Sequence, residues 1–260
     1  MATYRIKAVK YCEQSTPGPE MYLFSHWDEW IEVYFYFFIL RGSDGRICLV
    51  DTGVRDVDEI NPGVIAGVGE RGRFRMDMQS QNIPLLLERE GLDPASVDYV
   101  FLTHLHYDHC SNVKLFPNAR YVVSRRGWQQ TIDCNIPEML PHPVFPQDIL
   151  SFLAEAARDR LVLAEDDQEV IPGISCFYTG GHTLCGQAVK VQTPSGTAIF
   201  SGDVAFLYGN LEQNHPIGLV TNVQECYQAM ARIREEADLI IPGHDPEILA
   251  RYPDGVIVAF

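Results

Sequence analysis

Short apolar runs alternate along the chain with stretches whose apolar residues recur at helical spacing. Residues 33–40 are aromatic and β-branched, a glycine-containing turn follows, and a second apolar run ends at Gly53, so this segment predicts a β-hairpin. Further apolar runs predict strands at 97–104, 174–182, 187–193, 197–203 and 237–244. Helical spacing predicts helices at 80–92, 146–160 and 223–237.

The order of these elements indicates the fold class. Strands come first, a helix follows, and the second half repeats the order, so an α+β protein of two halves packed sheet to sheet is expected. Two stretches, 61–79 and 132–147, show no clear periodicity because Gly, Arg and Pro interrupt them. Long irregular segments of compact domains often carry function, so both are of interest.

Composition and charge exclude several classes of partner. The 260 residues include 46% hydrophobic and 21% charged residues, an ordinary globular composition, with a formal net charge of -15. A field of that sign repels phosphate backbones and anionic lipid, so no nucleic acid and no membrane partner is expected. The first residues contain no apolar leader, and the seven cysteines follow no framework spacing, which favours a cytoplasmic protein with reduced thiols.

The densest group of ligand-type side chains is the segment THLHYDHC, residues 103–110. It places His104, His106, Asp108 and His109 within six positions at the end of an apolar run. In an extended segment the first three point the same way, and a turn after the strand swings His109 to a second position. Such a segment supplies ligands to two adjacent metal ions, although a polar surface loop is the simpler alternative.

Three further donors stand at comparable places in the chain. His182, Asp203 and His244 each follow an apolar strand and each lies beside glycine, which allows the backbone to turn sharply. A catalytic zinc usually takes three protein ligands and keeps one open position. Two zinc ions therefore need donors beyond the first cluster, and these three residues can supply them.

With these motifs in view, the chain resembles the metallo-β-lactamase superfamily. The signature is HLHYDH, accompanied in order by LVDTG, GGHT, FSGD and PGHD. The resemblance implies a single domain over 1–260 with a four-layer αββα sandwich and two Zn²⁺ at one edge. It assigns His104, His106 and His182 to one zinc, Asp108, His109 and His244 to the other, and Asp203 as the bridge. Asp51, in LVDTG, would support the ligands from behind.

Chemistry follows from such a pair of metals. Two zinc ions lower the pKa of a shared water from about 15.7 towards ~7, which makes a bridging hydroxide available to attack a carbonyl. Asp108 would also be catalytic, by passing a proton to the leaving alkoxide. Mixed histidine and carboxylate sites accept iron or manganese as well.

Several substrates remain open for such a hydrolase. The size of the chain and the PGHDPEI motif most resemble the N-acyl-homoserine-lactone lactonases, which implies opening of a lactone or a related cyclic ester or amide. Alternatives are a glyoxalase II-like thioesterase, a non-quorum-sensing ring-opening hydrolase, a flavin-linked di-iron oxidoreductase and a non-catalytic binding module. The oxidoreductase is disfavoured because His106 stands where those relatives carry Glu. The partner is a small-molecule substrate, and the oligomeric state is left open, with a homodimer as one option.

One position departs from the lactonase pattern. In that branch a tyrosine stands three residues after the bridging aspartate, whereas this chain has Phe206 there. Tyr208 is the nearest phenol in sequence and is therefore a candidate catalytic residue. Cys110 and Cys185 lie beside presumed ligands, but the ligand set is complete without them, which favours a packing role.

Overall fold

The computed structural model describes residues 2–259 as two β-sheets packed face to face. The seven-stranded sheet has the order β12-β1-β2-β3-β4-β5-β6, with bounds β1 Tyr4–Pro17, β2 Trp30–Gly42, β3 Ile47–Val50, β4 Tyr99–Phe101, β5 Arg120–Ser124, β6 Leu161–Ala164 and β12 Val256–Val258. The five-stranded sheet has the order β11-β10-β9-β8-β7, with bounds β7 Glu169–Ile171, β8 Ile174–Tyr178, β9 Gln187–Thr193, β10 Gly196–Phe200 and β11 Leu239–Ile241.

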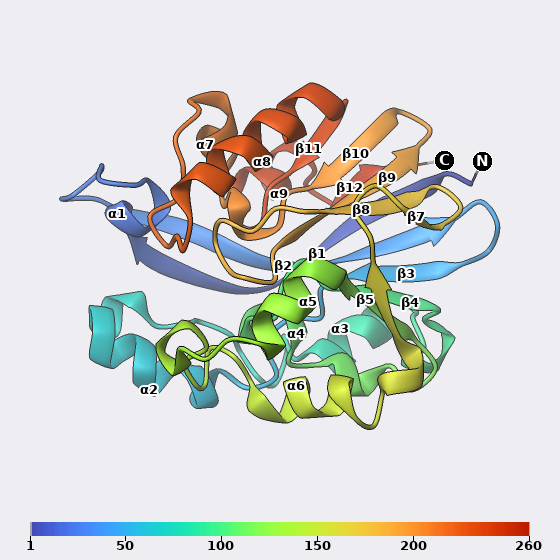
Figure 1. Ribbon diagram of the computed structural model, residues 1–260, viewed down its shortest axis with the longest axis horizontal. Helices are drawn as coiled ribbons and strands as arrows, with labels where there is room; N and C mark the ends of the chain where they lie inside the picture. Colours follow the sequence, from blue (N-terminus) through green and yellow to red (C-terminus); the bar gives the residue numbers. More distant parts are fainter. Residues whose placement is uncertain (1, 260) are drawn as a thin grey trace.

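Helices cover the outer face of each sheet, which gives the four-layer αββα sandwich that the resemblance implied (Figure 1). On the seven-stranded side lie α2 Val57–Val68, α3 Ile83–Arg89, α4 Tyr107–Cys110, α5 Arg125–Ile132 and α6 Gln147–Ala154. On the five-stranded side lie α7 Tyr208–Glu212, α8 Val223–Glu236 and α9 Glu247–Arg251. The short α1, Gly18–Met21, lies at the tip of the β1–β2 hairpin.

A continuous apolar layer fills the space between the sheets. Phe38 and Phe101 of the first sheet and Val189 and Phe200 of the second are all nearly inaccessible to solvent and belong to one cluster. The rings of Phe38 and Phe200 pack edge to face at a centroid distance of 4.9 Å. Burial of these side chains holds the two sheets together.

Pairs of parallel strands from both sheets end at the same edge of the sandwich. β3 and β4 are parallel, and so are β10 and β11. The chain leaves each strand at its carboxyl end through a loop, and ligand sites in α/β sheets form at this end of the strands. The predicted donors follow β4, β8, β10 and β11, which explains why they can converge.

Most of the predicted elements are present, and the structure adds several that were not predicted, among them β5, β6, β7, α5, α7 and α9. The hairpin, the strands and the three helices are confirmed, but the segment His104–Asp108 is not extended, because β4 ends at Phe101 and α4 begins at Tyr107. The unassigned stretch 61–79 contains most of α2, whose periodicity is masked by Pro62. The long β1 was not expected, and β12 from the C-terminal end pairs with it, so the two halves are joined. Within residues 2–259, no helix is long and apolar enough to cross a membrane.

Candidate metal centre

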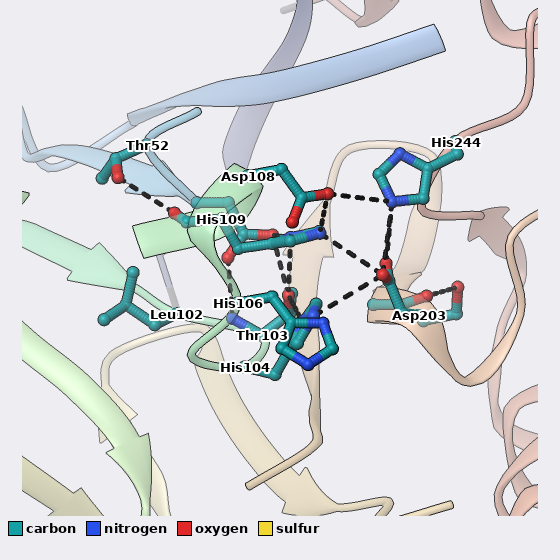
Figure 2. Close-up of polar contacts among 12 residues, drawn as sticks. Thr52, Leu102, Thr103, His104, His106, Asp108, His109, Asp203 and His244 are labelled. Carbon is teal, nitrogen blue, oxygen red and sulfur yellow. Dashed lines mark hydrogen bonds and ion pairs between the residues drawn. The ribbon is translucent and has the colours of Figure 1, made fainter. Parts of the chain in front are cut away.

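The structure brings all seven predicted donors together at one edge of the sandwich. His104 and His106 lie in the loop after β4, and Asp108 and His109 lie on α4 (Figure 2). The other three come from the loops after β8, β10 and β11, and they are His182, Asp203 and His244. The expectation that Asp108 points the same way as His104 and His106 is wrong, because the turn of α4 places Asp108 with His109 in a second group of donors.

The donors form two groups that share one carboxylate. In each group the candidate ligand atoms lie within 4.8 Å of one another. The first group is His104, His106, His182 and Asp203, and the second is Asp108, His109, Asp203 and His244. The division agrees with the two ligand sets that the resemblance implied, with Asp203 between them.

Distances around Asp203 show how tightly the groups converge. Its Oδ2 lies 3.5 Å from Nε2 of His104, 3.5 Å from Nε2 of His182 and 3.4 Å from Nε2 of His109. Its Oδ1 lies 3.1 Å from Nε2 of His244. Four imidazoles thus point one nitrogen each at a single buried carboxylate, and three of them, His104, His109 and His244, are labelled in Figure 2.

The donor atoms fit a pair of divalent cations. Among the described residues, Nε2 of His104, Nε2 of His109 and Oδ1 of Asp203 are buried and make no hydrogen bond. Buried polar atoms without a partner are costly, and a pair of cations, one in each donor group, would satisfy all three. Zinc is commonly bound by histidine nitrogens and carboxylate oxygens, and iron and manganese are bound by the same kinds of ligand.

Burial and the neighbouring charges favour the metal-binding forms of His104, His106 and Asp203. Burial lowers the pKa of His104 and lowers that of His106 to about 3, which keeps both imidazoles neutral with a free lone pair. Burial alone would raise the pKa of Asp203, but the histidines around it, His109 foremost, hold it well below its usual range. Asp203 is therefore a carboxylate in any neutral solution.

Hydrogen bonds behind the donors fix their orientation. Oδ2 of Asp51 lies 2.8 Å from Nδ1 of His109, and the same carboxylate accepts hydrogen bonds from the backbone N–H and the hydroxyl of Thr103. Nδ1 of His182 lies 2.6 Å from the carbonyl of Leu219. These contacts turn Nε2 of both histidines toward Asp203, and such supporting contacts commonly tune metal affinity.

A cavity of about 490 Å³ opens onto the donors. Among the seven, His106, Asp108, His182, Asp203 and His244 line it. The remaining wall is mainly apolar and comes from β2, α2 and four connecting segments, and it includes Val33, Phe35, Ile60, Val64, Val68, Phe74, Met139, Val144, Phe145, Phe206, Leu219 and Val220. The two stretches without clear periodicity, 61–79 and 132–147, thus both supply residues to the wall of the cavity.

Phe206 and Tyr208 occupy different environments. The Phe206 ring lines the cavity, with its centroid 5.5 Å from those of His182 and His244. Tyr208 is not part of the cavity wall; its ring packs in the core between the sheets and lies 3.7 Å beneath the guanidinium of Arg251. The structure therefore does not bring Tyr208 to the donors, because the chain turns into α7 at that residue.

The two cysteines beside the donors are packed in the core. Cys110 and Cys185 are buried, and burial raises the pKa of both thiols. Neither belongs to the two donor groups. Their placement agrees with the packing role favoured by the sequence.

Fold and donor set together define a metal-dependent hydrolase. The model of the metallo-beta-lactamase superfamily matches residues 33–244, and the chain belongs to this superfamily. The N-acyl homoserine lactonase of Bacillus thuringiensis is 26% identical over 216 residues, which cover 81% of this chain and 80% of that protein. The activity in that name belongs to the Bacillus protein, and for this chain it is a hypothesis.

Solved structures show the same fold. A complex of N-acyl homoserine lactone hydrolase with the product N-hexanoyl-L-homoserine at its metal centre superimposes with a TM-score of 0.77 and 21% identity, over 96% of this chain and 97% of that one. AidC, a dizinc quorum-quenching lactonase, superimposes with a TM-score of 0.68 and 14% identity, over 94% of this chain and 88% of that one. At these identities the likeness establishes the architecture.

Proposed function

We propose that the protein is a lactonase that uses two zinc ions to open a lactone bearing an apolar acyl group, with N-acyl homoserine lactones as the leading candidates. The observation that carries this proposal is the position of the two donor groups at the floor of a mainly apolar cavity. The product-bound relative and the dizinc relative support the choice of ring and metal.

The seven donors would hold the ions in two sites joined by Asp203. When bound, such a pair supplies a water of lowered pKa and polarises a carbonyl oxygen. Oδ2 of Asp108 lies 3.1 Å from Nε2 of His109 and faces the cavity, so this carboxylate is placed to carry a proton to the leaving oxygen of the ring. Phe35, Phe145 and Phe206 form apolar walls that exclude bulk water from the reacting carbonyl.

The cavity also discriminates against the thioesterase alternative. Among residues 2–259, no lysine or arginine lines the cavity. Glutathione carries carboxylates, which need cationic partners when they leave water. The arginines near residues 71–75 do not supply them, because Arg75 pairs with Glu13 and Glu32, Arg73 pairs with Glu70, and Arg71 stacks on Trp30.

A substrate panel tests the proposal. Metal-analysed protein is assayed on N-hexanoyl and N-decanoyl homoserine lactones, a simple γ-lactone, the matching lactam and an acyl-glutathione thioester. We expect the acyl homoserine lactones to give the highest kcat/KM. A higher kcat/KM on the thioester, or no ring opening by protein that carries its metals, would contradict the proposal.

A further inference from the structure

One wall of the cavity carries polar side chains. Gln14 and Thr16 lie two residues apart near the end of β1 and therefore share one face of the strand, and Glu20 follows on α1. All three line the cavity beside the apolar wall. This side of the cavity can form hydrogen bonds with a polar group of a substrate, whereas the apolar wall can only exclude water.

Most hydrogen-bonding side chains on the wall already have a partner within the protein. The amide of Gln14 donates to the carbonyl of Gly72 and accepts from the hydroxyl of Thr16. Tyr107 donates to the carbonyl of Asp56, and Thr221 donates to the carbonyl of Gly181. These groups are committed to holding the walls in place.

The carboxylate of Glu20 differs from them. Within residues 2–259, no hydrogen bond or ion pair reaches it, although the side chain is half-buried. Burial raises the pKa of this carboxyl, as expected for an acidic group that has lost water and gained no partner. A half-buried carboxylate with no partner in the protein can accept a hydrogen bond from a ligand in the cavity.

The backbone holds Glu20 in a defined place relative to the donors. Its carbonyl accepts hydrogen bonds from the N–H groups of Gly218 and Leu219, at 2.9 and 3.3 Å. The carbonyl of Leu219 in turn lies 2.6 Å from Nδ1 of His182. One short loop therefore connects the Glu20 backbone with a donor of the first metal site.

We propose that Glu20 is a specificity residue that accepts a hydrogen bond from an N–H group on the ring substituent of the substrate. This inference rests on the proposed lactonase function and narrows it to rings with an acylamino or amino substituent. Beside Glu20 an anionic substituent would be repelled by the carboxylate, because no lysine or arginine of residues 2–259 lines the cavity. The role is recognition, with no part in bond breaking.

Paired substrates test the role of Glu20. The first is N-hexanoyl homoserine lactone, and the second is its isostere in which a methylene replaces the amide N–H. Ring opening of both is measured for the wild type, Glu20→Leu and Glu20→Gln, and for Glu155→Gln, an exposed glutamate outside the cavity, as the matched control. Metal content and thermal midpoint are measured for each protein.

The informative quantity is the ratio of kcat/KM for the two substrates. The wild type and the Glu155→Gln control should prefer the N–H compound by roughly tenfold to a hundredfold, because hydrogen bonds to charged groups are among the stronger ones. Glu20→Leu should lower the ratio to near one, mainly through KM. Glu20→Gln keeps a neutral acceptor and should retain an intermediate ratio.

Other outcomes overturn the inference. A wild-type ratio near one, or equal ratios in the wild type and Glu20→Leu, would show that Glu20 reads no N–H group. A purely structural role would lower both rates together and leave the ratio unchanged, which also rejects it. If metal-loaded wild type opens neither ring, the lactonase function itself is wrong, and the inference falls with it.

Discussion

At the scale of single residues, Asp203 organises the centre. Its two oxygens lie within 3.5 Å of nitrogens from four histidines, and one of them makes no hydrogen bond. A buried carboxylate is tolerated where opposite charges satisfy it, so the cluster is poorly stabilised without cations. Burial disfavours the charged imidazolium, and it therefore accounts for the neutral state of His104 and His106.

Asp108 has two assignments, as a donor of the second site and as a proton carrier. Asp108→Asn keeps the shape of the side chain and removes its charge, so kcat should fall by about 10²- to 10⁴-fold. Circular dichroism should remain that of the wild type, and exposed Asp159→Asn should retain full activity. Turnover close to that of the wild type would remove Asp108 from the mechanism.

Phe206 and Tyr208 together test how the substrate carbonyl is activated. Phe206 faces the cavity, so Phe206→Tyr introduces a hydrogen-bond donor there and should raise kcat/KM on acyl homoserine lactones several-fold. Tyr208→Phe should change it less than twofold, because the Tyr208 ring packs away from the cavity. A loss of tenfold or more in Tyr208→Phe, with no gain in Phe206→Tyr, would restore Tyr208 as the catalytic phenol.

At the scale of elements, α8 supports the loop that carries His182. Oε2 of Glu225 accepts hydrogen bonds from the N–H of Gly181 and the hydroxyl of Tyr178, and Oε1 pairs with Arg126. Gly181 adopts a φ of +74°, which side chains rarely allow, so this hydrogen bond holds a special turn directly before the donor.

Removal of the Glu225 carboxylate should therefore loosen the first metal site. Glu225→Ala should weaken metal binding by about 10- to 100-fold, as loss of supporting contacts commonly does. Glu225→Gln, which keeps an acceptor, should restore most of the affinity, and exposed Glu235→Ala on the same helix should behave as the wild type. Competition with a chromophoric chelator measures the affinities, and equal values for Glu225→Ala and the wild type would reject this role.

Elements with a local signal could be predicted from the sequence, and those fixed by distant contacts could not. The strand β10 is a compact apolar run, whereas β1 mixes Lys, Glu and Tyr and is stabilised by pairing with β2 and β12. The helix α2 is hidden by Pro62, which lies in its middle and interrupts the apolar pattern.

The donors were predictable for a similar reason. Each stands near glycine or in the histidine cluster directly after an apolar strand, so the local pattern marks it. Glu20 carries no such mark, because it reaches the cavity through the folding of α1 against the loop at 218–219. Nearness in sequence likewise did not reveal that the chain turns into α7 at Tyr208, which places its ring outside the cavity wall.

At the scale of the whole molecule, the packing of the two sheets brings together the loops that follow their parallel strands at one edge of the sandwich. The first sheet contributes His104, His106, Asp108 and His109, and the second contributes the other three donors. Neither sheet alone can complete a metal site, because each of the two groups contains residues from both. Metal binding should therefore stabilise the packing of the sheets against each other.

The number of bound metals tests the central claim most directly. Protein produced with ample zinc and freed of loosely bound metal is analysed by elemental mass spectrometry against its concentration. The two donor groups that share Asp203 predict close to two transition-metal ions per chain. A value of one, or none, in folded protein would contradict the paired centre on which the proposed chemistry depends.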